Sequence, residues 1–145
     1  MAIPALGRAY ARLHDDAWAL VRIALGAPLI PHGLYKLASL VGLGSGQPAG
    51  FFATTERTLG PLLTYSLAML EVVAGILVVL GLGTRIAAFM IALFMVGAVV
   101  GRLADGFFWT GGGYEYPLVL LLLAIAVTVR GGGERSLDRR QPAEI

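Results

Sequence analysis

The sequence contains no cysteine, and this absence excludes several kinds of site at once. Disulfides, thiolate catalysis, thioether-attached haem and cysteine-ligated iron–sulfur or zinc centres all require that residue. Only two histidines are present, His14 and His32, and they are not neighbours in the sequence, so no metal or haem site is predicted. Any redox chemistry must therefore use groups other than sulfur supplied by this chain.

Charged residues are also scarce. They make up 14% of the chain, whereas soluble proteins average about 25%. The net charge is only +2, and no long run of lysine and arginine is present that could neutralise phosphates. We therefore do not expect nucleic acid to be a partner.

Apolar residues are abundant instead, at 57% of 145 residues, which leaves too little polar surface to cover a soluble globule. Crossing a hydrocarbon core about 30 Å thick takes roughly 20 helical residues. Four apolar segments reach or approach that length, at 17–40, 62–82, 85–104 and 115–130; the last is the most purely apolar but the shortest. We predict an all-α fold, an integral membrane four-helix bundle in contact with the lipid bilayer, as a single transmembrane domain over residues 1–145.

The ends of these segments carry local signals. A short helix on the membrane surface is expected before the first span, because one helical face there gathers Ile3, Leu6, Tyr10 and Leu13. Gly81 and Gly83 can end the second helix in the left-handed conformation, and Thr84 can N-cap the third. So short a turn predicts an antiparallel hairpin of the second and third helices.

The cations set the expected orientation, because cytoplasmic loops carry an excess of lysine and arginine. With four spans both termini lie on one side, and Lys36, Arg57 and Arg102 fall on or near the other. The side of the termini collects Arg8, Arg12, Arg85, Arg130, Arg135, Arg139 and Arg140. Both termini are therefore predicted to be cytoplasmic.

Glu71 is the most informative residue, because it places a carboxyl group near the middle of the second span. An ionised side chain deep in a bilayer costs at least about 2.5–3.5 kcal/mol, and such groups usually face the bundle interior and find partners there. The candidate partners are the cationic or protonatable groups of the first span, namely Arg22, His32 and Lys36.

Polar residues at the outer ends of the other spans could join Glu71. Arg102 ends the third span, and Glu115 and Tyr116 begin the fourth, at the level of Lys36. A polar cluster is predicted in the outer half of the bundle from His32, Lys36, Glu71, Arg102 and Glu115. The alternative is that Glu71 and one cation form a buried pair that only fixes the register of the helices, while Arg102 and Glu115 anchor the membrane interface.

Several short motifs follow one another along the spans: Arg22 with Gly26, HGLYKL, Glu71 with Gly75, LGLGTR, Gly112 and Gly113 before Glu115 and Tyr116, and GGGERSLD. In this order and spacing, from Val21 to Asp138, the chain resembles the DoxX family of small bacterial and archaeal membrane proteins. The resemblance implies a four-helix, multi-pass protein of the bacterial cytoplasmic (inner) membrane that serves as an oxidoreductase subunit.

The first functional hypothesis is a quinone-interacting membrane subunit of an oxidoreductase complex. His32 and Glu71 would be the catalytic groups that donate or accept protons, and Arg22 or Lys36, both in the predicted quinone-binding set, would stabilise developing negative charge. The rest of the predicted quinone-binding set is Arg102, Glu115 and Tyr116. No electron-donor centre is encoded, so a protein partner subunit is expected.

Two other classes stay open from the sequence. The chain could be a non-catalytic assembly or anchoring subunit, whose buried charges only lock the bundle. It could also be a small transporter, but four spans without an internal repeat would need a homo-oligomer to build a pathway.

Overall fold

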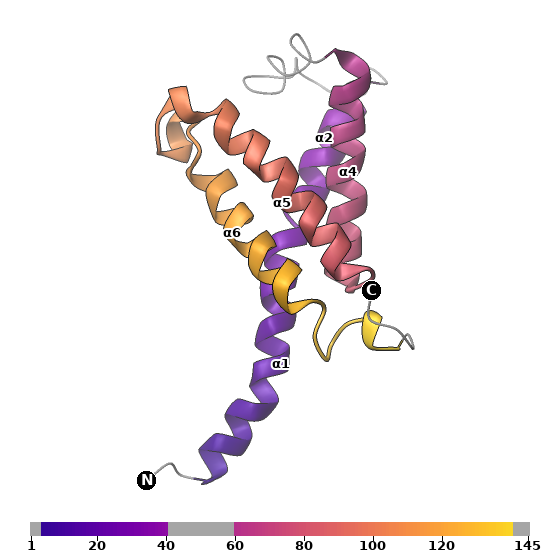
Figure 1. Cartoon of the computed structure of the whole chain (residues 1–145), viewed down its shortest axis with the longest axis vertical. Helices are drawn as coiled ribbons and strands as arrows, with labels where there is room; N and C mark the ends of the chain where they lie inside the picture. The colour runs from indigo at the N-terminus through magenta and orange to yellow at the C-terminus, as the bar shows by residue number, and fades with distance from the viewer. Residues whose placement is uncertain (1–3, 41–59, 141–145) are drawn as a thin grey trace.

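The computed structural model describes residues 4–40 and 60–140, and this part of the chain is helical, with no strand. The helices are α1 (Pro4–Gly26), α2 (Leu29–Leu40), α4 (Pro61–Leu80), α5 (Thr84–Gly101) and α6 (Glu115–Arg130), with the short 3-10 turns η1 (Leu103–Asp105), η2 (Trp109–Gly111) and η3 (Asp138–Arg140) (Figure 1). The helices expected at 62–82, 85–104 and 115–130 are thus confirmed within a few residues. Arg57 lies outside the described residues.

Three helical stretches of the described residues are long and apolar enough to cross a membrane: Leu13–Ser39, Pro61–Leu80 and Thr84–Gly101. The predicted fourth span corresponds to α6, which has 16 residues. At 1.5 Å per residue, α6 is about 24 Å long, shorter than a typical hydrocarbon core.

The first span differs from the prediction in two ways. It is two helices rather than one, because α1 ends at Gly26 and α2 begins at Leu29. Pro28 has no N–H to donate and disfavours helical geometry at the residue before it, which accounts for the break. The expected short N-terminal helix is not separate either; it forms the first half of α1, since no proline interrupts residues 5–27 (Figure 1).

The hairpin of α4 and α5 is present. Gly81 ends α4 in the left-handed conformation, as predicted, but the start of α5 is capped by a different residue from the predicted one. Gly81 adopts the left-handed conformation at φ 73° and donates its N–H to the carbonyl of Leu77 at 2.8 Å. Thr84 does not cap α5 but is its first residue. The carboxylate of Asp138 takes that role, because it accepts hydrogen bonds from the backbone N–H of Gly83 at 2.6 Å and of Thr84 at 2.9 Å.

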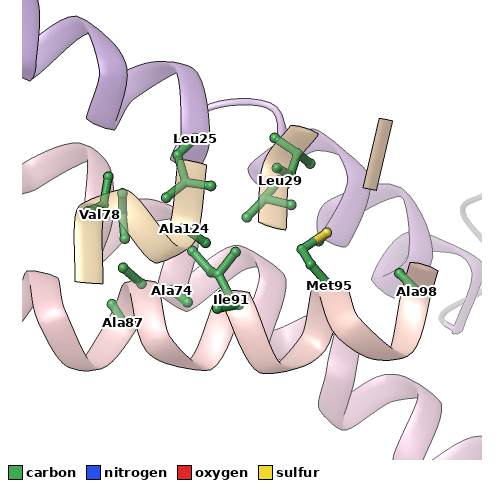
Figure 2. Close-up of a cluster of buried hydrophobic side chains, with 13 residues drawn as sticks. Leu25, Leu29, Ala74, Val78, Ala87, Ile91, Met95, Ala98 and Ala124 are labelled. Atoms are coloured by element: carbon green, nitrogen blue, oxygen red, sulfur yellow. The ribbon is translucent and has the colours of Figure 1, made fainter. Parts of the chain in front are cut away.

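The helices pack as two pairs. α2 lies along α4 and α5 lies along α6, while α4 also contacts α5 and α1 contacts both α4 and α6. From the hairpin outwards, α5 and α6 lean away from α2 and α4 (Figure 1). The buried core includes Leu25, Leu29, Val78, Ile91 and Ala124 (Figure 2).

The segment after α6 ties the helices together at the end that holds the α4–α5 hairpin. Trp18 of α1 donates its indole N–H to the carbonyl of Gly131 at 3.0 Å, and Arg22 donates to the carbonyl of Arg135 at 2.9 Å. The backbone N–H of Asp138 donates to the carbonyl of Gly81 at 2.9 Å. Residues 131–140 therefore form a clasp that joins α1, the end of α4 and the start of α5; we call it the C-terminal clasp.

The carboxylate of Asp138 in the C-terminal clasp is held in its ionised form. Burial by itself would raise the pKa of Asp138, but hydrogen bonds from Thr84 and Gly83 and the positive charge of Arg22 outweigh burial and lower the pKa below its ordinary value. An ionised carboxylate also suits the N-terminus of a helix, where the unpaired N–H groups carry partial positive charge.

Candidate functional site

A cavity of about 620 Å³ lies where the two helix pairs diverge. Its wall is formed by α2 and α4 on one side, by α5 and α6 on the other, and by the loop between α5 and α6. The lining includes six of the seven residues predicted from the sequence: His32, Lys36, Glu71, Arg102, Glu115 and Tyr116. Its apolar part includes Leu29, Phe94, Met95, Ala98, Trp109 and Leu120.

The partner of Glu71 is Lys36. The ammonium group of Lys36 donates a hydrogen bond to Oε1 of Glu71, and the two side chains form an ion pair between α2 and α4. Glu71 is only 2% exposed, so the ion pair compensates a charge that would otherwise be buried alone. The Lys36 ammonium also lies 5.5 Å from the centre of the Phe94 ring of α5, so the lysine interacts with side chains of both helix pairs.

α2 and α4 approach each other closely enough for Lys36 to reach Glu71. A Cβ atom placed on Gly33 would lie 2.7 Å from the carbonyl oxygen of Ala68 and 2.6 Å from a methyl group of Val72. Both distances are shorter than a non-bonded contact allows, so only glycine fits at this crossing. Gly33 lies one turn before Lys36, which places the lysine beside Glu71.

His32 and Tyr116 face each other from opposite helix pairs. Their ring centres are 6.3 Å apart with the planes tilted by 43°, His32 on α2 and Tyr116 in the first turn of α6. Both side chains remain partly accessible. They can thus contact a molecule in the cavity without first losing a buried partner.

Arg102 and Glu115 hold the loop between α5 and α6 where it lines the cavity. Arg102 donates from Nη1 to the carbonyl of Gly112 at 3.0 Å, and Oε2 of Glu115 accepts the backbone N–H of Trp109 at 3.2 Å. Gly113 fits this turn because a Cβ there would lie 2.2 Å from the carbonyl oxygen of Gly106. These contacts hold Trp109 where its side chain lines the cavity.

The structure does not bring Arg22 to this cavity. Arg22 is 2% exposed and contacts the C-terminal clasp: its Nη1 lies against Gly81 and its Nη2 donates to the carbonyl of Arg135. It precedes Lys36 by 14 residues, or about four helical turns, and the break at Pro28 lies between them. Of the three candidate partners for Glu71, therefore, Lys36 makes the contact and Arg22 lies at the opposite end of the fold.

Sequence reasoning missed most of the apolar wall. Phe94, Ala98 and Arg102 recur every four residues and so share one face of α5. The cluster predicted from the sequence includes Arg102 of that row but neither Phe94 nor Met95. The available signal is the four-residue spacing of Phe94, Ala98 and Arg102, which places an aromatic ring and a guanidinium on one helical face.

The arrangement can bind a molecule with both polar and apolar parts. Its polar groups are an ion pair, a guanidinium, a second carboxylate, an imidazole and a phenol, and aromatic and aliphatic side chains surround them. Over the residues 4–40 and 60–140, no three histidine, aspartate or glutamate side chains group closely enough to hold a metal ion. The chemistry that these groups support is hydrogen bonding and proton exchange with a bound organic molecule.

Three apolar helices of the described residues are long enough to span a membrane, and the molecule is a multi-pass membrane protein. The sequence profile of the DoxX family matches residues 17–104, and the chain belongs to that family. A similar protein is "Putative oxidoreductase CatD" of Bacillus subtilis (strain 168), 30% identical over 119 residues, which are 82% of each chain. No solved structure matches the chain significantly.

Proposed function

We propose that this protein is a quinone-interacting membrane subunit of an oxidoreductase complex. The observation that carries the proposal is the cavity between the two helix pairs, in which the buried Lys36–Glu71 ion pair meets an aromatic wall. Pockets for organic cofactors combine a mostly apolar lining with a few placed polar groups. The oxidoreductase name of the Bacillus relative supports the same class of activity.

The residues present fit a quinone. Phe94 and Trp109 supply aromatic faces for a planar ring, and Leu29 and Leu120 supply aliphatic contact. Lys36 and Arg102 carry hydrogen-bond donors that suit carbonyl oxygens. A bound quinone would supply the two-electron, two-proton chemistry of the membrane pool, while a protein partner supplies the electron donor.

His32 and Glu71 are the groups that would exchange protons. The imidazole of His32 is partly accessible at the cavity, and histidine changes protonation near neutral pH more readily than other side chains. The Glu71 carboxylate is buried and held at one oxygen by Lys36. Lys36 and Arg102 would stabilise negative charge on a bound oxygen.

The same proposal includes the membrane arrangement. The helices form a single four-span domain with α6 as the fourth span, in a thinned bilayer region or with its ends at the interface. Both termini are cytoplasmic and the cavity lies towards the opposite face of a bacterial inner membrane. The arginines of the inner end, including Arg85, Arg130 and Arg135, support this orientation.

The functional test is to purify the full-length protein from its native membranes and to analyse co-purifying lipids and proteins by mass spectrometry. We expect a stoichiometric quinone and a redox partner protein. The variant Phe94→Ala should lose the quinone, because it removes one aromatic face, while Phe89→Ala on the exposed side of α5 should retain it. Finding neither quinone nor redox partner in the wild-type preparation would contradict the proposal.

The orientation can be tested separately, because the natural chain has no cysteine. Thr110→Cys lies in the outer loop and Glu134→Cys lies in the C-terminal clasp, and both positions are exposed. In intact cells a membrane-impermeant maleimide should label only Thr110→Cys. The reverse pattern would show the opposite orientation.

A non-catalytic assembly subunit is the second candidate, and the C-terminal clasp favours it. That clasp buries Arg22 in contacts that only join helices, and the Lys36–Glu71 ion pair could be read in the same way. The two candidates differ for Glu71→Gln: a quinone site predicts slowed quinone-linked electron transfer in a folded protein. A purely structural ion pair predicts reduced thermal stability and unchanged turnover by the partner.

A further inference from the structure

The two oxygens of the Glu71 carboxylate have different surroundings. Oε1 accepts the hydrogen bond from Lys36. Oε2 is buried, and within the described residues it has no hydrogen-bond partner. Leaving a buried acceptor unsatisfied costs free energy, and more so when the group is charged. A ligand with an O–H group could remove that cost, whereas a ligand with only carbonyl oxygens could not.

Glu71 is well placed to make this distinction. As the anionic partner of the Lys36 ammonium, the Glu71 carboxylate is an acceptor and cannot donate. Lys36 and Arg102, which also line the cavity, are donors that serve a carbonyl oxygen and a hydroxyl oxygen equally. His32, Glu115 and Tyr116 can also accept but are partly accessible, so Oε2 of Glu71 is the buried acceptor that separates the two kinds of ligand.

We infer that the cavity is selective for the hydroxyl-bearing form of its ligand, a hydroquinone rather than a quinone, because an O–H of that form donates to the Glu71 carboxylate. This inference rests on the proposed function, since it names which redox form of the quinone is held. The hydroquinone ring lies against the aromatic wall, and its hydroxyl donates to Oε2 of Glu71, the oxygen that does not accept from Lys36.

The test compares an alkyl hydroquinone with its dimethyl ether, which has the same ring and tail but no O–H. Binding of each to the full-length protein in lipid nanodiscs is measured by titration calorimetry under anaerobic conditions, with empty nanodiscs as the blank. For the wild-type protein we expect the hydroquinone to bind about tenfold or more tightly than the ether, the effect typical of a hydrogen bond to a charged group.

Glu71→Gln supplies the decisive comparison. The amide oxygen can face Lys36, so the amide NH₂ then occupies the position of Oε2 and is a donor rather than an acceptor. The preference for hydroquinone over ether should fall to about one, or reverse. Because the methyl groups add the same bulk in both proteins, the change in this ratio isolates the hydrogen bond. Glu134→Gln, in the C-terminal clasp, is the matched control and should keep the wild-type ratio.

The outcomes separate the two proposals. If hydroquinone, ether and parent quinone all fail to bind the wild-type protein above the blank, the proposed function is wrong. If they bind the wild-type protein with equal affinity, the quinone site stands and the selectivity is wrong. The wild-type comparison alone decides whether the cavity is selective, even where Glu71→Gln does not fold. Glu71→Asp, which retains a carboxylate, then serves as the second variant. It should keep part of the preference for hydroquinone.

Discussion

Gly33 of α2 lies directly against Glu71 of α4, so closely that a Cβ atom on the glycine would be 3.1 Å from the Cβ of the glutamate. The crossing of these two helices therefore has no room for a side chain at the position one turn before Lys36. Because the lysine reaches Glu71 from that crossing, a single glycine determines whether the buried carboxylate has a cation beside it.

We expect Gly33→Ala to lower the unfolding free energy by about 1–3 kcal/mol, the usual cost of forcing extra volume into a packed contact. The alanine methyl would press on Ala68, Val72 and Glu71 and move α2 away from α4. Gly97→Ala is the control, because a Cβ there meets no described atom within 4 Å. Thermal unfolding in detergent should show Gly97→Ala neutral or up to about 1 kcal/mol more stable. Equal losses for the two variants would contradict the role of Gly33.

The Lys36–Glu71 ion pair predicts that removing its cation and removing its anion have unequal effects on stability. Lys36→Met leaves an uncompensated buried carboxylate and should cost about 3–5 kcal/mol of stability. Glu71→Gln should cost less, since the amide oxygen can still accept from Lys36. The double variant Lys36→Met/Glu71→Gln should be more stable than Lys36→Met alone, because no buried charge remains. Additive losses in this double-mutant cycle would show that the pair is not coupled.

Two glycines of the α4–α5 turn provide a matched pair. Both have positive φ, 73° at Gly81 and 56° at Gly83, so alanine at either adds backbone strain of about 1–2 kcal/mol. A Cβ at Gly81 would also lie 1.5 Å from Nη1 of Arg22 and 2.6 Å from Ser136, while one at Gly83 meets no described atom within 4 Å. Gly81→Ala should therefore be clearly less stable than Gly83→Ala. It should also be cut faster by protease after residue 131, because displacing Arg22 opens the C-terminal clasp.

Asp138 predicts a pH dependence of stability. Its pKa is lowered in the folded protein, because the hydrogen bonds from Thr84 and Gly83 and the charge of Arg22 outweigh burial, which acts in the opposite direction. A group with a depressed folded pKa binds fewer protons in the folded than in the unfolded state, so its stabilisation is fully present above the unfolded pKa of about 3.9. That stabilisation should be lost as the pH falls from there through the lowered pKa.

Thermal unfolding of the wild-type protein between neutral and strongly acidic pH measures this loss. Asp138→Asn should be less stable at neutral pH and should lack this part of the acid dependence. Thr84→Val, which removes one hydroxyl donor to the carboxylate, should shift the loss to higher pH. Asp105→Asn, in the exposed turn η1, should follow the wild-type curve. A wild-type curve that coincides with that of Asp138→Asn would refute the role of this carboxylate.

The sequence contained enough information for the helices and for most of the polar cluster. Apolar length alone located α4, α5 and α6, because a bilayer requires about 20 apolar residues in a row. A carboxyl group in the second of them required a partner, because an isolated charge in hydrocarbon is too costly. His32, Lys36 and Glu71 could be named on these grounds, since both arguments depend only on the order of residues along the chain.

Tertiary structure decided which cation meets Glu71, where Arg22 lies and what caps α5. Arg22 and Lys36 were equivalent as candidates on a continuous first span, but the break at Pro28 and the crossing at Gly33 bring only Lys36 to the carboxylate. Asp138 reaches the start of α5 from 54 residues away in the chain, a contact that no local pattern encodes. The sequence determined which groups needed partners, because the cost of burying them is a property of each residue; the choice among partners depends on distances between helices, which only packing sets.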